Sequence, residues 1–298
     1  MTKRTQDYSQ ILEEKRDELS KIKGILVDID GTLVDLQKYF SEESKLMVKR
    51  VEQTDLVLGL CTGRSYPMIK KYILPNFSQE SFHVLEDGGQ IITSNGQVEY
   101  EKKIESNLVR EICTIARQVG GEFGLTVGET VYYSQNFYDF IKNKDSWDLD
   151  MAPASELKNW ATTCINLFNI SNESLDKILQ MLDKTDLNIV KCKAKKLDDG
   201  DFANVLHLTA PGVNKGTTAE AWAKIHGLSL SDEIMMFGDG YNDDSVMKKV
   251  ALGIAMGNAV PELKKATDFV IGHVDDDSLP DFINQFLDKR RSWFLEKK

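Results

Sequence analysis

The chain has 298 residues, of which 41% are hydrophobic and 28% charged, and its net charge is −10. This balance is typical of a globular protein and excludes a disordered chain, while the acidic charge disfavours nucleic acid as a partner. No apolar run approaches the ~20 residues that cross a bilayer, and the N-terminus is too charged for a signal peptide, so we expect a cytoplasmic protein without a membrane partner.

The cysteines and histidines give no sign of a zinc site. There are four of each, they are widely spaced, and no two cysteines stand in a CxxC arrangement. Zinc ligands usually cluster at short spacings, and disulfide frameworks belong to secreted chains. We therefore interpret the cysteines as small buried hydrophobes in a reducing compartment.

The chain begins with helical patterns that alternate with short, continuously apolar strands. The first strand ends in Asp28-Ile29-Asp30-Gly31-Thr32, and the second ends in Cys61-Thr62-Gly63-Arg64. In chain order we predict a helix over 6–22, a strand over 24–27, a helix over 41–53, a strand over 56–60 and a helix over 65–74.

The middle of the chain, roughly residues 85–204, has shorter and more polar strand patterns. A helix-start signal at Ser171 precedes the second of two predicted helices. Here we predict strands over 90–93, 98–100, 130–134, 164–170 and 187–192, and helices over 105–119 and 172–184. This texture indicates a separate α+β unit.

The apolar strands then resume and again alternate with helices. We predict strands over 205–208, 234–237, 252–255 and 269–271, and helices over 215–226, 260–266 and 278–289. Such an alternation predicts a parallel sheet covered on both faces, and therefore the α/β class. We divide the chain into an N-terminal helical extension (1–21), an α/β core (22–84 and 205–298) and an inserted α+β domain (85–204).

Polar side chains follow the ends of these apolar strands. Asp28 and Asp30 follow the first strand, Thr62 follows the second, and the run Asp239 to Asp243 follows the strand at 234–237. Lys215 opens a helix shortly after the strand at 205–208. The carboxyl ends of parallel strands meet at one edge of an open sheet, so we expect these groups to line one crevice.

This set of groups suits phosphoryl transfer. A carboxylate such as Asp28 can be the nucleophile, and Asp30, two residues on, can protonate the leaving oxygen and later deprotonate water. Gly31 allows a close turn around a phosphate and can offer its N–H. Two carboxylates would repel a phosphate, which an oxygen-ligated Mg²⁺ held by a third carboxylate, Asp239, would relieve. Lys215 adds fixed positive charge.

Each of these signals alone has an ordinary structural interpretation. Asp-x-Asp-Gly and Gly238-Asp239-Gly240 are good turns, Thr62 could be a helix cap, and most lysines are solvated. Four turns would not be expected to fall in this order at strand ends and helix starts. The ordered set is therefore a stronger signal than its parts.

At this point the sequence resembles a known family. DIDGTL (28–33), CTGR (61–64), Lys215 in APGVNKGTTAEAWAKIHGL and FGDGYND (237–243) are similar to the four ordered motifs of the haloacid dehalogenase superfamily. The stretch ALGIAMGNAVPELKKATDFV (251–270) and the place of the insert resemble the Cof-type branch, subclass IIB. The resemblance covers residues 22–84 and 204–290, and over the insert it rests on place and length.

The resemblance implies a Rossmann-like core under a mobile cap, and Mg²⁺-dependent hydrolysis of a small phosphate ester such as a sugar phosphate. It implies that Asp28 is the nucleophile and a metal ligand. Asp30 would be the general acid and base, with its backbone carbonyl on the metal. Asp239 would bind the metal, with Asp243 beside the metal or directly behind it.

The resemblance also implies a phosphate site. Thr62, Gly63 and Asn242 would hold the phosphate, and Lys215 would tie it to Asp28. One segment departs from the pattern, because many relatives carry Asn-Gly-Ala where this chain has Glu86-Asp87-Gly88-Gly89. That segment joins core to cap, so substrate preference does not carry over. Cap candidates for substrate contact are Tyr132, Tyr133, Lys191 and Lys193.

Two alternatives stay open. A phosphosugar mutase would use the same nucleophile but pass the phosphoryl group to a second sugar hydroxyl. A catalytically silent sugar-phosphate-binding regulator would have lost the nucleophile or the acid, whereas Asp28 and Asp30 are both present. We expect a monomer or homodimer, with the N-terminal helix serving packing or an oligomer contact.

Overall fold

The computed structural model describes residues 6–35, 39–142, 149–195 and 202–296. Its first sheet has five parallel strands in the order β14-β13-β12-β1-β2. These strands are β1 (Gly24–Val27), β2 (Val57–Leu60), β12 (Ile234–Gly238), β13 (Leu252–Ala255) and β14 (Phe269–Val270). The predicted α/β class is confirmed, because continuous apolar strands such as β1 are buried along their whole length.

Helices cover both faces of this sheet. In β1, Ile25 and Val27 belong to the apolar cluster formed with α3 (Glu42–Glu52) and α12 (Ser278–Glu296). Leu26, between them, packs with Trp222 of α8 (Lys215–Ile225) on the other face. Because successive strand residues point to opposite faces, a strand covered on both sides must be apolar at every position.

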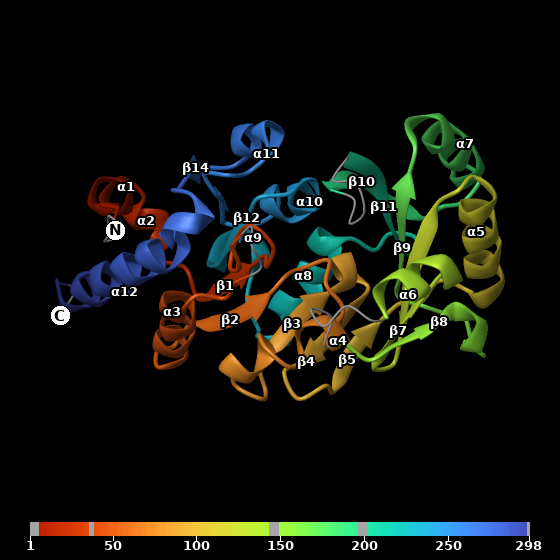
Figure 1. Ribbon diagram of the computed structural model, residues 1–298. Helices are drawn as coiled ribbons and strands as arrows, with labels where there is room; N and C mark the ends of the chain where they lie inside the picture. The colour runs from red at the N-terminus through yellow and green to blue at the C-terminus, as the bar shows by residue number, and fades with distance from the viewer. Residues whose placement is uncertain (1–5, 36–38, 143–148, 196–201, 297–298) are drawn as a thin grey trace.

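The N-terminal segment packs on the end of this core. The helix predicted over 6–22 is two short helices, α1 (Ser9–Glu14) and α2 (Arg16–Leu19). Leu12 and Leu19 are fully buried, and the ring of Tyr8 packs edge-on against Phe282 of α12 with centroids 5.3 Å apart. Figure 1 shows α1 and α2 beside α12 at this end of the molecule. The segment therefore packs against the core through these side chains.

The direction in which successive strands are added to the sheet changes between β1 and β12. From β1 the chain continues outward to β2 and then to β3 (Phe82–Leu85), which is linked to the end of β2 by a parallel bridge between Cys61 and Val84. From β12 it continues the other way, to β13 and β14. The loops after β1 and β12 therefore diverge, and the carboxyl edge of an open α/β sheet at such a point is where ligands usually bind.

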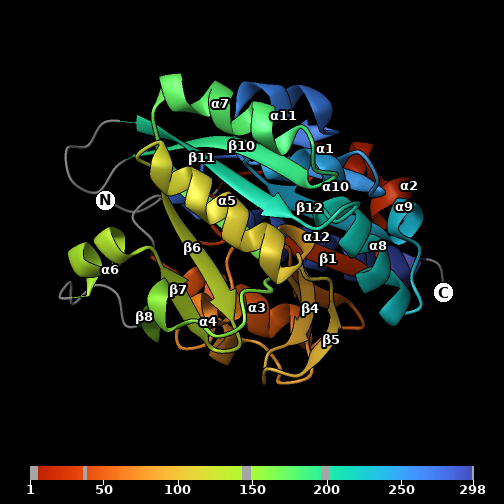
Figure 2. The ribbon, with the colours of Figure 1, turned by 90° about the vertical axis from the view of Figure 1, so that its right-hand side faces the viewer.

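The second sheet has six strands in the order β10-β11-β9-β6-β7-β8. They are β6 (Glu122–Val127), β7 (Thr130–Tyr133), β8 (Met151–Pro153), β9 (Cys164–Ile170), β10 (Asn188–Lys195) and β11 (Phe202–Thr209). Two helices, α5 (Ser106–Gln118) and α7 (Asn172–Leu182), lie over one face of it (Figure 2). The other face is turned toward the parallel sheet (Figure 1).

A smaller antiparallel sheet joins the two parts. It is formed by β3, β4 (Gln90–Thr93) and β5 (Val98–Glu101), in that order. Ile91 of β4 packs in the same cluster as Trp222 of α8. The segment from 90 to 101, expected at the start of the insert, therefore packs on the parallel-sheet side.

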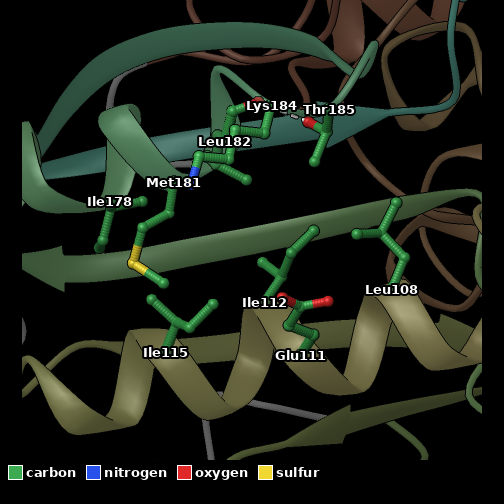
Figure 3. A pocket seen from close by; sticks show the side chains of 9 residues that line it. All are labelled: Leu108, Glu111, Ile112, Ile115, Ile178, Met181, Leu182, Lys184 and Thr185. Atoms are coloured by element: carbon green, nitrogen blue, oxygen red, sulfur yellow. Dashed lines mark hydrogen bonds between the residues drawn. The ribbon is translucent and has the colours of Figure 1, made fainter.

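An apolar groove runs between α5 and α7 on the outer face of the six-stranded sheet (Figure 3). Ile112 and Ile115 from α5 face Ile178 and Met181 from α7. None of the residues that line it belongs to the strand-end motifs. This groove is therefore separate from the predicted crevice.

Two differences from the expected elements concern the six-stranded sheet. The expected boundary at 205 falls inside β11, which pairs with β9 and β10 and so lies in the six-stranded sheet. The strand β6 was missed because Gly124 interrupts its apolar pattern. A Cβ at Gly124 would lie 3.0 Å from the ring of Tyr133 on β7, so the glycine makes room for that ring.

Among the described residues, none of the helices is long and apolar enough to span a membrane.

Candidate active site

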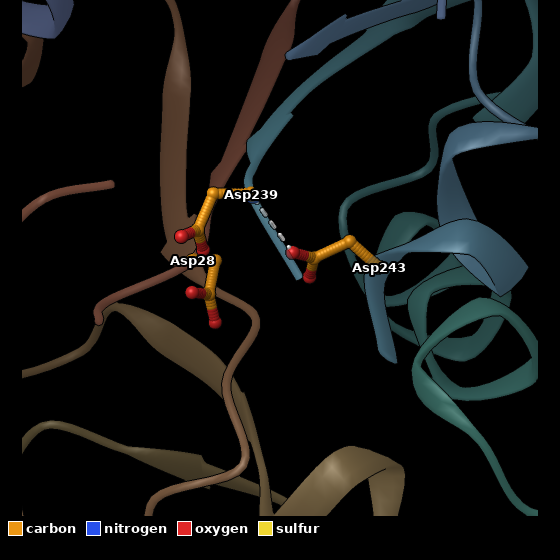
Figure 4. A group of neighbouring side chains, drawn as sticks. All are labelled: Asp28, Asp239 and Asp243. Carbon is orange, nitrogen blue, oxygen red and sulfur yellow. Dashed lines mark hydrogen bonds between the residues drawn. The ribbon is translucent and has the colours of Figure 1, made fainter. Parts of the chain in front are cut away.

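Three carboxylates meet where β1 and β12 end (Figure 4). Asp28 follows β1 directly, Asp239 follows β12, and Asp243 closes the short helix η4 (Tyr241–Asp243). One oxygen from each lies within 4.8 Å of the other two. The convergence predicted from the strand ends is thus seen for these three side chains, and Asp28 and Asp243 are buried.

Lys215 provides the positive charge of the cluster. Its Nζ lies 2.8 Å from Asp28 Oδ1 and 2.7 Å from Asp243 Oδ1, and its side chain is completely buried. It begins α8, whose N-terminus is capped by Asn214 in a reciprocal arrangement with Thr217. Burial alone would lower the pKa of Lys215, but the charges of Asp243 and Asp28 raise it well above its ordinary value. The ammonium therefore stays charged.

The crowded carboxylates raise one another's proton affinity. Burial and the charges of Asp243 and Asp239 raise the pKa of Asp28 well above its ordinary value, against the pull of Lys215. Burial and the charge of Asp243 raise the pKa of Asp239 to about 7. Oxygen donors that repel one another in this way match the needs of a hard dication such as Mg²⁺, which takes carboxylate and carbonyl oxygens. The residues present fit that ion.

Asp243 also holds the loop that carries Asp239. Its Oδ2 accepts hydrogen bonds from the backbone N–H groups of Asp239 at 3.0 Å and Gly240 at 2.9 Å. Its Oδ1 accepts from Lys215. Both carboxylate oxygens of Asp243 accept hydrogen bonds from N–H donors, so Asp243 holds Lys215 and the loop that carries Asp239 in place.

Asp30 is gripped by an arginine that the sequence analysis quoted but assigned no role. Arg64 donates from Nε to Asp30 Oδ2 at 2.7 Å and from Nη2 to Asp30 Oδ1 at 2.8 Å. Burial alone would lower the pKa of Arg64, but the hydrogen bonds and charge of Asp30 raise it. Bidentate pairs of this kind fix the plane of the carboxylate. Arg64 therefore orients Asp30 at the mouth of the crevice.

Gly31 does not play the part expected of it. Its N–H donates to the carbonyl of Val34 at 2.9 Å, so this group is not available to a phosphate. The glycine is needed for another reason, because its φ is +79° and a Cβ would lie 2.2 Å from Asp239 Oδ2. Gly31 thus lets Asp239 approach the end of β1 closely.

Asn258 is a site residue that sequence reasoning missed. Its Nδ2 donates to the carbonyl of Gly31 at 2.8 Å and to Asp239 Oδ2 at 3.1 Å. Its Oδ1 accepts from the N–H of Val274. It lies just beyond the end of β13, at the same carboxyl edge, and that position was the signal that could have found it.

Thr62 and Gly63 form the loop after β2. The Thr62 hydroxyl oxygen accepts the N–H of Arg64 at 3.2 Å, which leaves its O–H as a donor. The Thr62 carbonyl accepts the N–H of Asp87. A Cβ on Gly63 would stand 3.1 Å from Asp87 Oδ2, so this loop and the linker after β3 are in close contact.

Asn242, predicted to hold phosphate, is bound to Asp87. Its Nδ2 donates to Asp87 Oδ1 at 2.7 Å, and His207 Nδ1 of β11 lies 2.5 Å from Asp87 Oδ2. Asp87 belongs to the linker segment that departs from the family pattern. Burial alone would raise its pKa, but the charge and hydrogen bond of His207 lower it to about 2. His207 thus balances the charge that the departure introduces.

The cap candidates are divided between the two faces of the six-stranded sheet. Tyr132 packs in the cluster under α5 and α7. Tyr133 pairs with Gly124, which also pairs with Asn166, so it lies on the opposite face, where it is buried against Phe137 of α6 (Gln135–Ile141). Lys191 pairs with Leu206, whose side chain belongs to the cluster under α5 and α7, so it is on the wrong face of the sheet. The side chain of Lys193 lies outside the described residues. On the face toward the parallel sheet, Tyr133 is joined by Asn166 and His207, which are a cross-strand pair.

Ion pairs also join the two parts at the rim. Lys70, which follows α4 (Tyr66–Ile69), donates to Glu129 Oε2 at 2.7 Å and Asp150 Oδ2 at 2.9 Å. Both acids belong to loops of the six-stranded sheet, and Lys70 lies on the parallel-sheet side. The inserted sheet is therefore held over the core at the rim as well as at Asp87.

Comparison with known proteins identifies the family. A family model for haloacid dehalogenase-like hydrolases matches residues 25–283. The 5-amino-6-(5-phospho-D-ribitylamino)uracil phosphatase of Bacillus subtilis strain 168 is 22% identical over 252 residues, 84% of this chain and 89% of that protein. The HMP-PP phosphatase of Enterobacter sp. strain 638 is 24% identical over 274 residues, 88% and 94% of the two chains.

A solved structure, that of a subclass IIB sugar phosphatase of the superfamily, aligns with a TM-score of 0.71 at 21% identity, over 89% of this chain and 98% of that one. This likeness agrees with the α/β fold described above. Since the family model spans most of the residues, the chain belongs to the haloacid dehalogenase-like hydrolases and is a phosphoric monoester hydrolase of that family.

Proposed function

We propose that this enzyme is a Mg²⁺-dependent phosphatase that hydrolyses a small phosphorylated metabolite, a sugar phosphate, through an aspartyl-phosphate on Asp28. The observation that carries the proposal is the position of Asp28. It ends β1 at the switch point of the sheet, with Lys215 on one oxygen and Asp239 beside it. A rigid carboxylate between a fixed cation and a candidate metal site is suited to attack on phosphorus.

The first half of the reaction would form the aspartyl-phosphate. An oxygen of Asp28 attacks the phosphorus, and the bond from phosphorus to the ester oxygen breaks. Asp30, in its protonated form, gives its proton to the departing oxygen. Because Arg64 stabilises the ionised form of Asp30, arrival of the substrate must loosen that ion pair before Asp30 can hold the proton.

The second half would return the enzyme to its starting state. Asp30, now ionised, takes a proton from a water molecule as that water attacks the phosphorus. The bond from phosphorus to Asp28 breaks and inorganic phosphate leaves. The ionised Asp30 gripped by Arg64 is the form required for this half. The proton that Asp30 gains is the one it donates in the next turnover.

A Mg²⁺ ion would be held by Asp28, Asp239 and the backbone carbonyl of Asp30, with Asp243 behind them. When bound, it would neutralise the phosphoryl charge that these carboxylates otherwise repel. Two observations support this assignment. The three carboxylates approach one another closely, and the pKa of Asp239 is raised.

The phosphate would be held by Thr62, Gly63, Asn242 and Lys215. Gly31 is removed from this set as an N–H donor, because that N–H is already used within the loop. Lys215 would bridge the phosphate and Asp28. The Thr62 hydroxyl keeps a free donor, and its buried position keeps water away from it.

A sugar phosphate is proposed because the solved structure that this fold matches over most of its length is a sugar phosphatase, and because a curated relative acts on a phosphoribityl compound. We further propose that the catalytic core is formed by residues 22–84 and the segment after β11, with the cap between them and residues 1–21 as a structural extension. Since the four cysteines are free, a reducing cytoplasm suits the protein.

The test is phosphate release from a panel of sugar phosphates, nucleotides and p-nitrophenyl phosphate, with Mg²⁺ and with EDTA. The wild type is compared with Asp28→Asn. We expect release that needs Mg²⁺ and is lost in the variant. Release that survives in Asp28→Asn would show that the nucleophile is misassigned. No release from any ester would overturn the phosphatase proposal, and transfer to a second sugar hydroxyl would instead indicate a mutase.

A further inference from the structure

Asp87 joins three segments that are far apart in the sequence. It lies in the linker helix η2 (Glu86–Gly88), is almost fully buried and has a left-handed backbone, with φ of +53°. One carboxylate oxygen meets Asn242 of η4 at 2.7 Å, and the other meets His207 of β11 at 2.5 Å. The active-site loop, the linker and the inserted sheet are thus connected through one side chain.

An ionised carboxylate can only accept hydrogen bonds, and this fixes how Asn242 lies. Its amide nitrogen must face Asp87, which uses one of the two N–H groups. The amide oxygen is turned back toward Gly240, where a Cβ would lie 2.7 Å from it. The second N–H remains as the donor that a phosphoryl oxygen can use.

His207 keeps Asp87 in the ionised form without adding net negative charge to the phosphate site. The groups that face the His207 ring are Asp87 from η2, Cys192 from β10 and Asn166 from β9. Burial alone would lower the pKa of His207, but Asp87 raises it to about 10. A lone carboxylate beside Gly63 would repel a phosphate, whereas the neutralised pair does not.

We propose that Asp87 and His207 are positioning residues for phosphate binding, in which His207 holds Asp87 and Asp87 holds the Asn242 amide with an N–H toward the phosphoryl group. This inference rests on the proposed function, because it takes Asn242 as a phosphate ligand. Its consequence is that the inserted sheet sets the geometry of the phosphate loop through β11. The cap would then contribute to phosphate affinity without touching the phosphate.

The test measures inhibition by inorganic phosphate, together with KM and kcat, in Asp87→Ala, His207→Gln and Asn242→Ala. Asp87→Ala removes the carboxylate that both His207 and Asn242 contact, so the Asn242 amide loses its fixed orientation. We expect phosphate to bind about tenfold more weakly in Asp87→Ala and in His207→Gln, with KM rising more than kcat falls. His226→Gln, a histidine of α8's C-terminal cap with no contact to the site, is the matched control.

Two double variants separate positioning from general damage. With Asn242→Ala already present, His207→Gln should weaken phosphate binding clearly less than it does alone, because the part of its effect that passes through Asn242 is gone and only the charge of Asp87 remains. In Asp87→Asn/His207→Glu, the new amide can donate to the new carboxylate and accept from Asn242, so phosphate affinity should return to within about threefold of the wild type. Thermal unfolding of each variant checks that it folds.

Additive losses in the first double variant, or no loss in either single variant, would overturn this inference. So would failure of the second double variant to recover affinity while remaining folded. If instead the wild type releases no phosphate from any ester, the proposed function itself fails, which is a different outcome. If Asp87→Ala does not fold, His207→Gln and its combination with Asn242→Ala still decide the question.

Discussion

Arg64 grips both carboxylate oxygens of Asp30, with donor–acceptor distances of 2.7 and 2.8 Å. The pair lies at the crevice mouth, where Arg64 is mostly covered and Asp30 is 38% exposed. An arginine fork fixes both the position and the plane of a carboxylate, which a lysine cannot do. The proposed proton donor is therefore held in place by a residue of the loop after the neighbouring strand.

Arg64→Lys keeps the charge but loses the fork. We expect kcat to fall about tenfold in steady-state assays, because Asp30 is less well oriented toward the leaving oxygen. Arg64→Gln should lose more, about a hundredfold, since the charge is lost as well. The charge-matched control is Arg50→Lys on α3, whose partners Asn284 and Asp288 lie away from the crevice. Equal activity of Arg64→Lys and the wild type would exclude this role.

Lys215→Met tests the buried ion cluster. The substitution leaves Asp28 and Asp243 buried without their cation. Removing one partner from such a cluster costs about 3–5 kcal/mol of unfolding free energy, which urea denaturation measures. Activity should also be lost, because the nucleophile and the phosphate both lose their fixed positive charge.

The triple substitution Lys215→Met/Asp28→Asn/Asp243→Asn is the control for Lys215→Met. It removes all three charges together, so it should recover much of the lost stability but none of the activity. A single variant Lys215→Met that is as stable as the wild type would show that the cluster contributes nothing to folding.

The positions of Asp28, Asp239 and Lys215 could be predicted because each is marked by the residues next to it in the sequence. Asp28 ends an apolar strand, and Asp239 ends another, so parallel-sheet topology alone brings them together. Lys215 lies at a helix start with a recognisable cap at Asn214. The strands of the parallel sheet were placed within one residue because full burial makes them continuously apolar.

The partners of these residues could not be predicted, because they depend on packing between distant segments. Arg64 meets Asp30 across 34 positions, and His207 meets Asp87 across 120. The apolar pattern of β11 identifies a strand but not the sheet it joins, so the boundary at 205 was misplaced. The N–H of Gly31 was predicted to bind phosphate but donates to the backbone carbonyl of Val34, and no residue pattern in the sequence predicts that hydrogen bond.

Asp239→Asn tests metal binding without a need for substrate. If Asp28 and Asp239 hold Mg²⁺, the ion binds the folded state and raises its thermal midpoint relative to EDTA. At a free Mg²⁺ concentration a hundred times the dissociation constant, the gain in unfolding free energy is about 2.7 kcal/mol. The gain should disappear in Asp239→Asn and persist in Asp232→Asn, an exposed acid of α9 (Leu230–Glu233). An equal Mg²⁺ effect in both variants would contradict the site.

Lys70→Glu tests the ion pairs at the rim. The new carboxylate would repel Glu129 and Asp150, which Lys70 now attracts, and the cap should open more often. Exposed pairs are individually weak, about 0.2–1 kcal/mol each, so we expect KM to rise about threefold to tenfold. Added salt should raise KM in the wild type and lower it in the variant, because it screens attraction and repulsion alike.

The control for Lys70→Glu is Lys45→Glu on α3, which removes the same charge from a helix away from the rim. Its KM should match that of the wild type at every salt concentration. A rise in KM of the same size in both variants would mean that net charge, and not the contact at the rim, is responsible.

Glu86→Gln tests a buried acid in the linker next to Asp87. Burial raises the pKa of Glu86 to about 7, even though Thr163 donates to its Oε2, and its Oε1 has no partner among the described residues. A carboxyl whose folded-state pKa is raised favours the protonated form in the folded protein. Stability is therefore lost as pH rises from its ordinary value near 4.5 through 7, by about 3 kcal/mol in total.

Glutamine mimics the protonated acid at every pH, so the stability advantage of the variant over the wild type should be small at pH 5 and large at pH 8. The difference in unfolding free energy, measured in urea at both pH values, should approach about 3 kcal/mol at pH 8. Glu99→Gln on β5, an exposed acid, is the control and should show no such growth. A constant difference between pH 5 and 8 would mean that Glu86 does not titrate in this range, and the linker would then carry its charge at both.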